Sequence, residues 1–488
     1  MRGVIALDQG SHASRACLID DTGALRASAQ CAVQTRVQGD ACVEQNPQEL
    51  ADSLKQALQQ CLTQAPALQL QAAGLATQRS SIVCAERGTG RPLSPVLSWQ
   101  DRRNADWLES LRSEEPRIRR ITGLPLSAHY GASKMRWCLD HLPAVRRAAQ
   151  DGTLQLLPLA SWLVAQLTGR EPCADPANAS RTLLWDSATL DWSPELLKLF
   201  GIERAWLPDC VPTQGDFGRI AMPLTPPDGL PLRACTGDQS AVPFFAGAPD
   251  EHTGYINLGT GAFMQRPLIQ RPTDPAPLLG SVLCVNAGPG RTGPGNALYS
   301  LEGTVNGAGA AVRDFVAAGA HDEALLWTAL EALPDDTELP LFLNGVGGLG
   351  SPWWQANVDS RFIGSGDTLQ CFGAVIESIA ILLAVNFSYM TQQGPPLRRL
   401  LVMGGMSRSD WLCRRLAASC GTVVERVAPE ATARGAAALA APGLAHQWSA
   451  QIERRFQPAP LRGLAQRQST LLALLGSASA ESEKRRIT

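Results

Sequence analysis

The chain has 488 residues, of which 45% are hydrophobic and 18% charged, a balance typical of a globular protein with more than one domain. Its formal net charge of -2 provides no general attraction for nucleic acid or an anionic membrane, so an anionic ligand must be held by local groups. The 13 cysteines are scattered, contain no C-x-x-C pair and do not cluster with the six histidines. We therefore expect reduced thiols in a cytoplasmic protein, without a disulfide framework or a zinc site.

The first predicted element is a β-hairpin at the N-terminus. Residues 4–8 read as a strand, 9–14 as a turn and 15–19 as an antiparallel return strand. The turn contains Gly10 and the hydroxyl of Ser11. Backbone N–H groups in such a turn suit a phosphate group.

A helix and two strand ends follow. Asn46 is a candidate N-cap, with Pro47 at the first helical position and apolar residues at helical spacing as far as Leu62. A strand over 70–76 and another at 96–97 each run into polar residues, and such strand ends hold the ligand contacts of open α/β sheets. Trp99, at the second of these ends, is either a core or surface aromatic residue or a platform for a ligand.

A carboxylate follows a glycine near the midpoint of the chain. Asp238 lies after Gly237, between the apolar runs 230–232 and 242–245, so we expect it at the edge of a buried element. A lone aspartate in such a place is usually a helix cap or a turn former. The turns that precede and follow it in the sequence favour another role.

The second of these turns resembles the first. Residues 254–258 and 262–265 read as strands on either side of Gly259, Thr260 and Gly261, which is the pattern of the opening hairpin. One such turn in each half predicts two related domains that hold one phosphate chain between them. Asp238 then becomes a candidate base that removes a proton from a hydroxyl while ATP is held opposite.

Further glycine clusters lie at 303–309, 345–350 and 404–405, and the last follows a predicted strand at a position suited to a nucleoside. Residues 371–390 are the most apolar long segment. They include polar residues, so we predict a buried helix and not a membrane span. Residues 476–488 read as a frayed tail.

Taken in order, these stretches resemble the carbohydrate kinases of the FGGY family, and most closely its glycerol kinases. The likeness runs from Met1 to about Leu444, and no single motif carries it. The matching segments are 6–10 with 14–15, 43–47, 77–79, 98–103, 122–128, 133–137, 178–182, 190–192, 237–239, 258–261, 301–303, 348–350 with Pro352, and 404–405.

The resemblance implies an α/β fold of two actin-like (ribonuclease H-like) domains with an ATP and substrate cleft between them. We expect a substrate-side domain over 1–245, a nucleotide-side domain over 246–445, and an extension over 446–488 whose last part is disordered. The implied activity is ATP-dependent transfer of a phosphoryl group to a primary hydroxyl of glycerol or a related polyol or ketose. The oligomeric state stays open between a homodimer and a homotetramer.

The resemblance also implies roles for individual residues. Asp238 would be the general base, and Asp8 would position Mg²⁺ through water, in the way that magnesium usually binds. The acceptor would meet Arg79, Trp99, Asp238, Gln239 and Phe263, with Ser80 and His129 at two altered positions. The residues expected at ATP are Gly10, Ser11, Arg15, Thr260, Gly261, Gly309, Gly350, Gly404, Gly405 and Ser409.

This chain departs from the glycerol kinase pattern at several places. Ser80 stands where those enzymes have a Glu, His129 where they have a Tyr that contacts glycerol, and Gln355 where they have an Asp. Residues 225–229 replace a regulatory loop found in some of them, which puts control by a sugar bisphosphate in doubt.

These departures bear on the acceptor. Ser80 removes a charge-assisted contact, and His129 could titrate near neutral pH, so we predict an acceptor longer than glycerol. The alternatives are that His129 only packs while water fills the space beside Ser80, that the protein is a xylulose or ribulose kinase, or that it is a non-kinase ATPase of the actin fold.

Overall fold

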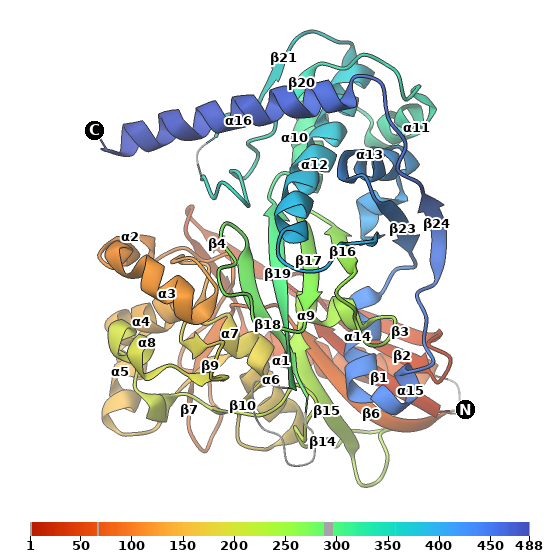
Figure 1. The fold of residues 1–488 in the computed structure, drawn as a ribbon. Helices are drawn as coiled ribbons and strands as arrows, with labels where there is room; N and C mark the ends of the chain where they lie inside the picture. The colour runs from red at the N-terminus through yellow and green to blue at the C-terminus, as the bar shows by residue number, and fades with distance from the viewer. Residues whose placement is uncertain (1, 66–67, 287–295, 357, 488) are drawn as a thin grey trace.

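The computed structural model describes residues 2–65, 68–286, 296–356 and 358–487, and two large mixed β-sheets dominate it (Figure 1). We call the part of the chain before strand β16 the first lobe and the part from β16 onward the second lobe. The first large sheet has the order β14-β15-β6-β1-β2-β3, and its strands are β1 (Arg2–Gln9), β2 (Ala13–Asp20), β3 (Leu25–Ala32), β6 (Gln69–Thr77), β14 (Arg219–Ile220) and β15 (Leu230–Gly237).

The second large sheet has the order β18-β19-β17-β16-β22-β23-β24. Its strands are β16 (Thr253–Leu258), β17 (Ala262–Leu268), β18 (Leu279–Val285), β19 (Ala297–Val305), β22 (Arg399–Met403), β23 (Val423–Val427) and β24 (Ile452–Phe456).

The two sheets share one core topology. In the first lobe β1 and β2 form the predicted hairpin, β3 extends it, and β6 and then β15 join β1 in parallel. In the second lobe β16 and β17 form the second hairpin, β19 extends it, and β22 and then β23 join β16 in parallel. The prediction that the two hairpins belong to related domains is confirmed by this shared strand order.

Helices cover both faces of the first sheet because its strands alternate between two apolar faces. Ile5 and Leu7 belong to a cluster with helices α1 (Pro47–Gln64) and α6 (Leu159–Thr168), whereas Val4 and Ala6 pack with α14 (Ala431–Ala440) of the second lobe. Helix α1 begins as predicted, with the Asn46 side chain accepting from the N–H groups of the first turn.

Helix α14 approaches the first lobe so closely that only glycine fits at two contacts. An ideal Cβ on Gly74 would lie 2.2 Å from the carbonyl oxygen of Ala436, and one on Gly435 would lie 1.9 Å from that of Ala241. This helix of the second lobe is thereby fixed against the sheet whose strand β15 precedes Asp238.

Helix α12 (Thr368–Thr391) is long and apolar enough to cross a membrane by length and composition alone. In the structure 78% of its most apolar window is buried, and the helix contacts α11, α13, β19 and β20. This confirms the prediction of a buried core helix. At the chain end, helix α16 (Leu464–Ile487) extends along the top of the second lobe in Figure 1. It includes most of the stretch predicted to fray, so the backbone there is helical and not an irregular tail.

The remaining elements surround these two sheets. A five-stranded sheet in the first lobe, of order β4-β5-β8-β7-β9, is built from β4 (Thr35–Gln38), β5 (Cys42–Gln45), β7 (Ile82–Glu86), β8 (Val96–Leu97) and β9 (Leu154–Pro158). The short strands pair as β10 (Cys173–Ala174) with β13 (Asp209–Cys210), β11 (Trp185–Asp186) with β12 (Asp191–Trp192), and β20 (Leu341–Leu343) with β21 (Arg361–Ile363). The other helices are α2 (Ala105–Glu109), α3 (Glu115–Thr122), α4 (Gly131–His141), α5 (Pro143–Gln150), α7 (Pro176–Ser180), α8 (Pro194–Phe200), α9 (Asp238–Ala241), α10 (Gly309–Gly319), α11 (Glu323–Ala332), α13 (Asp410–Cys420) and α15 (Pro442–Ala445).

Candidate active site

Asp238 lies where strand β15 ends and helix α9 begins, which confirms its predicted place at the edge of a buried strand. Its side chain is 28% exposed, and its Oδ1 accepts a hydrogen bond of 2.7 Å from the N–H of Gln239. Nε of Arg79 lies 3.9 Å from the same oxygen. Burial raises the pKa of Asp238, and the positive charge of Arg79 opposes that rise.

Gly237 allows Arg79 to approach Asp238. An ideal Cβ on Gly237 would lie 2.4 Å from both Cγ and Cδ of Arg79, so any larger residue would displace the arginine stem. The glycine before the carboxylate therefore has a packing role, in addition to its place in the motif.

The site contains a charged pair that the sequence did not reveal. Glu302 of β19 accepts two parallel hydrogen bonds from Arg79, from Nη1 at 2.9 Å and from Nη2 at 2.8 Å, and a third from Arg181. All three side chains are at most 10% exposed. Burial would raise the pKa of Glu302, but the two guanidinium groups hold it well below its usual range. A lone glutamate inside an apolar strand was the available signal.

Ser80 and His129, the two altered positions, are held by one buried lysine. Nζ of Lys134 donates to the carbonyl oxygens of Ser80, at 3.0 Å, and His129, at 2.6 Å, and Lys134 is only 1% exposed. Ser80 has a φ of 65°, a left-handed conformation that a residue other than glycine rarely adopts, and its hydroxyl is buried without a hydrogen-bond partner. Lys134 thus supports the backbone on which both side chains are mounted.

His129 does not titrate near neutral pH, so that expectation was wrong. Its ring lies edge-on to Trp99, with centroids 5.7 Å apart, and to Tyr130 at 5.0 Å. Burial lowers the pKa of His129 well below its ordinary value, and the positive charges of Arg102 and Lys134 lower it further. The ring is therefore neutral at physiological pH and serves as an aromatic wall.

Trp99 connects the acceptor side of the site to the first hairpin. Its indole Nε1 donates a hydrogen bond of 2.9 Å to Oγ of Ser11, which lies in the turn after β1. Gly10 shapes the same turn, and its N–H donates to the carbonyl of Ala13. The structure therefore brings Trp99, His129 and the predicted phosphate turn into one connected group.

Phe263 and Gln239 come to the site from opposite lobes. Nε2 of Gln265 donates to the carbonyl oxygen of Gln239 at 2.7 Å, so that face of β17 meets helix α9. Phe263 lies two residues before Gln265 and is therefore on the same face of the strand. Glu302 lies directly opposite Gln265 in the β17–β19 register, so its side chain shares this face.

Several buried polar atoms around Asp238 have no hydrogen-bond partner. Buried polar groups are normally satisfied, so such atoms indicate places where a hydroxylated ligand would bind. They are Oγ of Ser80, Oε1 of Gln239, Oε1 of Gln265 and Nε of Arg181.

Asp8 and Arg15 lie directly opposite each other on β1 and β2. Burial and the charge of Asp238 raise the pKa of Asp8 to about 7, while Arg15 lowers it and Glu430 raises it. Nη1 of Arg15 is 2.5 Å from Oε2 of Glu430, a residue with a φ of 74° at the start of α14. Arg15 is thus bound across the lobe interface.

The donor set around Asp8 is compatible with magnesium held mostly through water. Among the described ranges no group of three or more His, Cys, Asp or Glu side chains is placed to hold a metal ion directly. Mg²⁺ commonly binds through one or two carboxylates together with substrate phosphates and waters. Accumulated negative charge from Asp8 and Asp238 would favour a divalent cation between them and the phosphates.

The second hairpin is tied to helix α10. The N–H of Gly309 donates to the carbonyl of Gly259 at 3.0 Å, and that of Ala310 donates to the carbonyl of Thr260 at 2.9 Å. Nη1 of Arg313, one turn further on, is 3.5 Å from Oγ1 of Thr260. Gly261 completes this turn. Sequence reasoning did not single out Arg313.

Gly404 brings the turn after β22 against the same hairpin. Its φ is 93°, and an ideal Cβ there would lie 2.5 Å from the carbonyl oxygen of Leu258. Gly405 is exposed, with open space where a Cβ would stand, as a close approach of a nucleoside would require.

Two other predicted ATP contacts have structural partners in the protein. Ser409 is buried, and its hydroxyl caps helix α13 and contacts Glu331. An ideal Cβ on Gly350 would lie 2.3 Å from the carbonyl oxygen of Thr304, so this glycine permits close packing against β19. Gln355 forms a backbone bridge with Leu349 in the same segment. The nucleotide contacts of Ser409 and Gly350 stay predictions.

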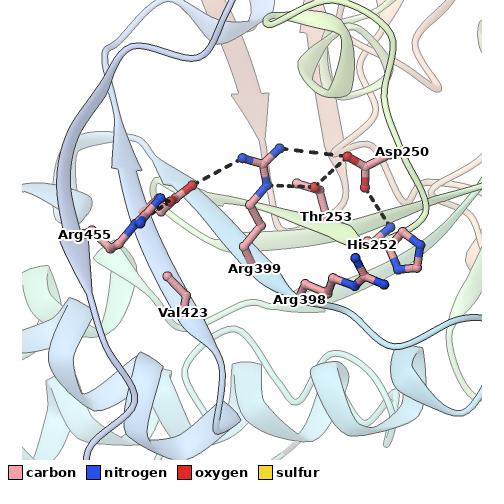
Figure 2. A pocket seen from close by; sticks show the side chains of 8 residues that line it. Asp250, His252, Thr253, Arg398, Arg399, Val423 and Arg455 are labelled. Carbon is pink, nitrogen blue, oxygen red and sulfur yellow. Dashed lines mark hydrogen bonds and ion pairs between the residues drawn. The ribbon is translucent and has the colours of Figure 1, made fainter.

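A surface cavity of about 380 Å³ lies at the beginnings of strands β16, β22 and β23, at the end of the second sheet opposite to Gly404 and the second hairpin turn (Figure 2). Arg399 lies between Thr253, Asp250 and the buried Glu425, which also binds Arg455. The cavity is separate from Asp238 and has no predicted site residue in its lining.

Two lobes of one topology, with glycine turns at two hairpins and a carboxylate beside an arginine at their interface, define a two-lobed phosphotransferase of actin-like fold. The sequence matches the models for the N-terminal domain of the FGGY family of carbohydrate kinases over residues 3–255 and for its C-terminal domain over 254–444. The chain belongs to the FGGY family of carbohydrate kinases.

Relatives agree with this assignment. The glycerol kinase of Bordetella parapertussis is 34% identical over 480 residues, which cover 93% of each chain, and that of Thermus brockianus is 35% identical over 448 residues, or 90% of this chain and 89% of the relative. The protein is an ATP-dependent phosphotransferase with an alcohol group as acceptor, and its substrate is a small sugar or polyol.

Solved structures show the same fold. The crystal structure of Plasmodium falciparum glycerol kinase with ADP has a TM-score of 0.84 at 21% identity and covers 99% of this chain and 98% of that chain. The xylulose kinase of Rhodospirillum rubrum has a TM-score of 0.85 at 21% identity, with coverage of 98% and 99%. The predicted fold class is confirmed.

Proposed function

We propose that the enzyme transfers the γ-phosphoryl group of ATP to a primary hydroxyl of a polyol or ketose, with Asp238 as the general base. The observation that carries this proposal is the position of Asp238 beside Arg79 at the lobe interface, between the two hairpins. A primary hydroxyl that reaches Asp238 would donate its proton to the carboxylate as its oxygen attacks the γ-phosphorus, while the bond from that phosphorus to the bridging oxygen breaks and ADP leaves. In a loose transition state this proton moves late, so a carboxylate is a sufficient base.

The hairpin turns and Asp8 would serve the nucleotide. N–H groups of the turns around Gly10 and Thr260 would donate to phosphate oxygens, and Gly405, beside Gly404, leaves space for the nucleoside. Mg²⁺, held by Asp8 through water, would neutralise charge on the phosphates. The protein's own contribution is thus to orient the two substrates and to exclude water.

The preference for an acceptor depends on three side chains, those of Ser80, His129 and Glu302. Ser80 is neutral and its hydroxyl has no partner, so it can donate to, or accept from, an acceptor hydroxyl. His129 supplies an aromatic wall with Trp99, and the carboxylate of Glu302 is already bound by two arginines. These features support a tetritol, pentitol or ketopentose in preference to glycerol, whereas the sequence relatives named glycerol kinase support glycerol as the second candidate.

A steady-state panel of polyols and ketoses, with ADP formation as the readout, tests both the kinase activity and the preference for a longer acceptor. We expect acceptor-dependent ADP formation, little ATP hydrolysis without acceptor, and a kcat/KM at least about tenfold higher for the longer acceptor. ATP hydrolysis that ignores every acceptor would contradict the kinase assignment. If glycerol is the best acceptor and Ser80→Glu brings no further gain for it, the argument for a longer acceptor fails.

A further inference from the structure

Glu302 joins the two lobes at the candidate base. It lies on β19 of the second lobe, whereas Arg79 follows β6 and Arg181 follows α7 in the first lobe. The fork between Glu302 and Arg79 is bidentate, and the Glu302 side chain is 5% exposed. Bidentate pairs fix geometry as well as charge, so this fork forms only when the lobes are held in this relative position.

Three contacts restrict where the Arg79 guanidinium can go. Its two terminal nitrogens are bound to Glu302, and Nη1 also lies 3.4 Å from Oγ of Ser240. Its stem packs against Gly237, where even a Cβ would collide with it. Only Nε is directed at Asp238, and the 3.9 Å separation is longer than a hydrogen bond.

The alternative partner of Arg79 is Asp238 itself. A guanidinium free of Glu302 could turn its fork to Asp238 and form a direct bidentate pair, as arginines and carboxylates commonly do. A carboxylate in such a pair has its lone pairs occupied, and it is a weaker base because the charged form is stabilised. Glu302 and Asp238 therefore compete for one cation.

We propose that Glu302 is a positioning residue that holds the fork of Arg79 away from Asp238 and so leaves the base free to accept the proton of the acceptor hydroxyl. Because Glu302 belongs to the other lobe, the base is ready only when the lobes are together. This inference rests on the proposed role of Asp238.

Arg181 fits the same account. It donates to Oε2 of Glu302, the oxygen that also accepts from Nη2 of Arg79, so that four charges of alternating sign, from Arg181 through Glu302 and Arg79 to Asp238, form one neutral group. Burial of a charge is tolerated when it is paired in this way. A purely structural role for Glu302, as a buried salt bridge between lobes, predicts lost stability and the small shift that the lost charge alone causes, but no loss of kcat at pH values where Asp238 is ionised.

The test is the pH dependence of kcat/KM for the acceptor in Glu302→Gln, from about pH 4 to pH 9. Activity of the parent enzyme should fall as pH falls, because the base Asp238 must be ionised and because protonation of the neighbouring Asp8 adds to the same fall, so each variant is compared with the parent. We call this fall of kcat/KM at low pH the acid limb. In Glu302→Gln, Arg79 is released and a nearby negative charge is lost, so we expect the midpoint of the acid limb to lie about one pH unit lower than in the parent. We also expect kcat to fall about tenfold or more, because Arg79 then occupies the base.

Glu425→Gln is the matched control. Glu425 is a carboxylate of the same sheet whose side chain is 2% exposed, and it too is bound by two arginines, Arg399 and Arg455, at the far cavity. It should lose comparable thermal stability while keeping the acid limb of the parent enzyme. Glu302→Asp keeps the negative charge but shortens the side chain, so it should weaken the bidentate pair with Arg79 and lower kcat without the shift that a lost charge causes. This variant also keeps the test decisive if Glu302→Gln does not fold.

Two results would overturn the inference. An acid limb that stays in place in Glu302→Gln, or a kcat of Glu302→Asp equal to that of the parent, reduces Glu302 to a structural salt bridge. A limb that moves equally in Glu425→Gln makes the shift a general charge effect. Asp238→Asn separates these from failure of the proposed function: if that variant keeps its activity and the parent's acid limb, Asp238 is not the base.

Discussion

The two hairpins have the same topology around them and carry different chemistry. In the first lobe Asp8 lies opposite Arg15, whereas the equivalent strands of the second lobe place Asn257 opposite Phe263. The parallel strands that follow differ in the same way. β6 is followed by Gln78 and the charged Arg79, whereas its equivalent β22 is followed by Gly404 and Gly405.

This difference separates two tasks within one duplicated fold. The first lobe concentrates charged side chains, which can accept a proton and hold a cation near the phosphates. The second lobe presents backbone, with glycines where a side chain would collide, which suits close contact with a nucleotide. Glu302 is a charged residue of the second lobe, and it is directed into the first. Changes in the first lobe should therefore affect kcat, and changes in the second hairpin should affect ATP binding.

The largest effect should come from Asp238→Asn. Asparagine keeps the size of the side chain but cannot act as a base at neutral pH. We expect kcat to fall by about 10²–10⁴-fold, the usual contribution of an acid–base group, while the melting temperature stays close to that of the parent. Activity within tenfold of the parent would remove Asp238 from the base role.

A loss of kcat on the order of 10²-fold is expected for Asp8→Asn, because a fixed charge beside the phosphates is removed. The variant should also need more free Mg²⁺ for half-maximal rate. A titration of rate against free Mg²⁺ at saturating ATP measures both quantities. An unchanged Mg²⁺ requirement would argue that Asp8 has no part in holding the cation.

Gly404→Ala should mainly raise the KM for ATP. A methyl group at a φ of 93° is strained and meets the carbonyl oxygen of Leu258, so the turn must move. Left-handed backbone costs a residue with a Cβ about 1–2 kcal/mol, which corresponds to about a tenfold rise in the KM for ATP. kcat should stay within about threefold of the parent, and Gly421→Ala, at a φ of 62° with open space around it, is the matched control.

The smallest effect should follow Thr260→Ala. The hydroxyl is a neutral group that accepts from Nη1 of Arg313 at 3.5 Å, and its loss leaves the backbone of the hairpin intact. A neutral hydrogen bond contributes about 0.5–1.5 kcal/mol, so the KM for ATP should rise by only about two- to tenfold. A large loss of kcat in this variant would indicate that the second hairpin takes part in phosphoryl transfer, which would contradict the division of roles between the two lobes.

Local signals were sufficient for much of the fold. Asn46 and Pro47 predicted the start of α1 because capping depends on residues close in sequence. The two glycine turns predicted both hairpins, and the resemblance in their order indicated two related domains. The length of α16 was not predicted, since its polar composition has little apolar periodicity.

The site was harder to predict than the fold. Asp238 was found because a carboxylate stood between two candidate phosphate turns. Glu302 was missed because its partner Arg79 lies 223 residues away in sequence, and no local pattern joins them. Lys134 was missed because a lysine in an amphipathic helix is usually solvated, whereas here its ammonium is bound to two backbone carbonyls. The neutral state of His129 depends on burial and on neighbouring cations, which also come from distant segments.

The central claim, that the first lobe performs the chemistry while the second hairpin holds the nucleotide, is tested most directly by calorimetric ATP binding to two variants. Asp238→Asn should bind ATP with a Kd within about twofold of the parent although it transfers no phosphoryl group, because only the base is lost. Gly404→Ala should bind ATP about tenfold more weakly although its chemical step is preserved. The account would be contradicted if Asp238→Asn lost ATP binding while Gly404→Ala kept it.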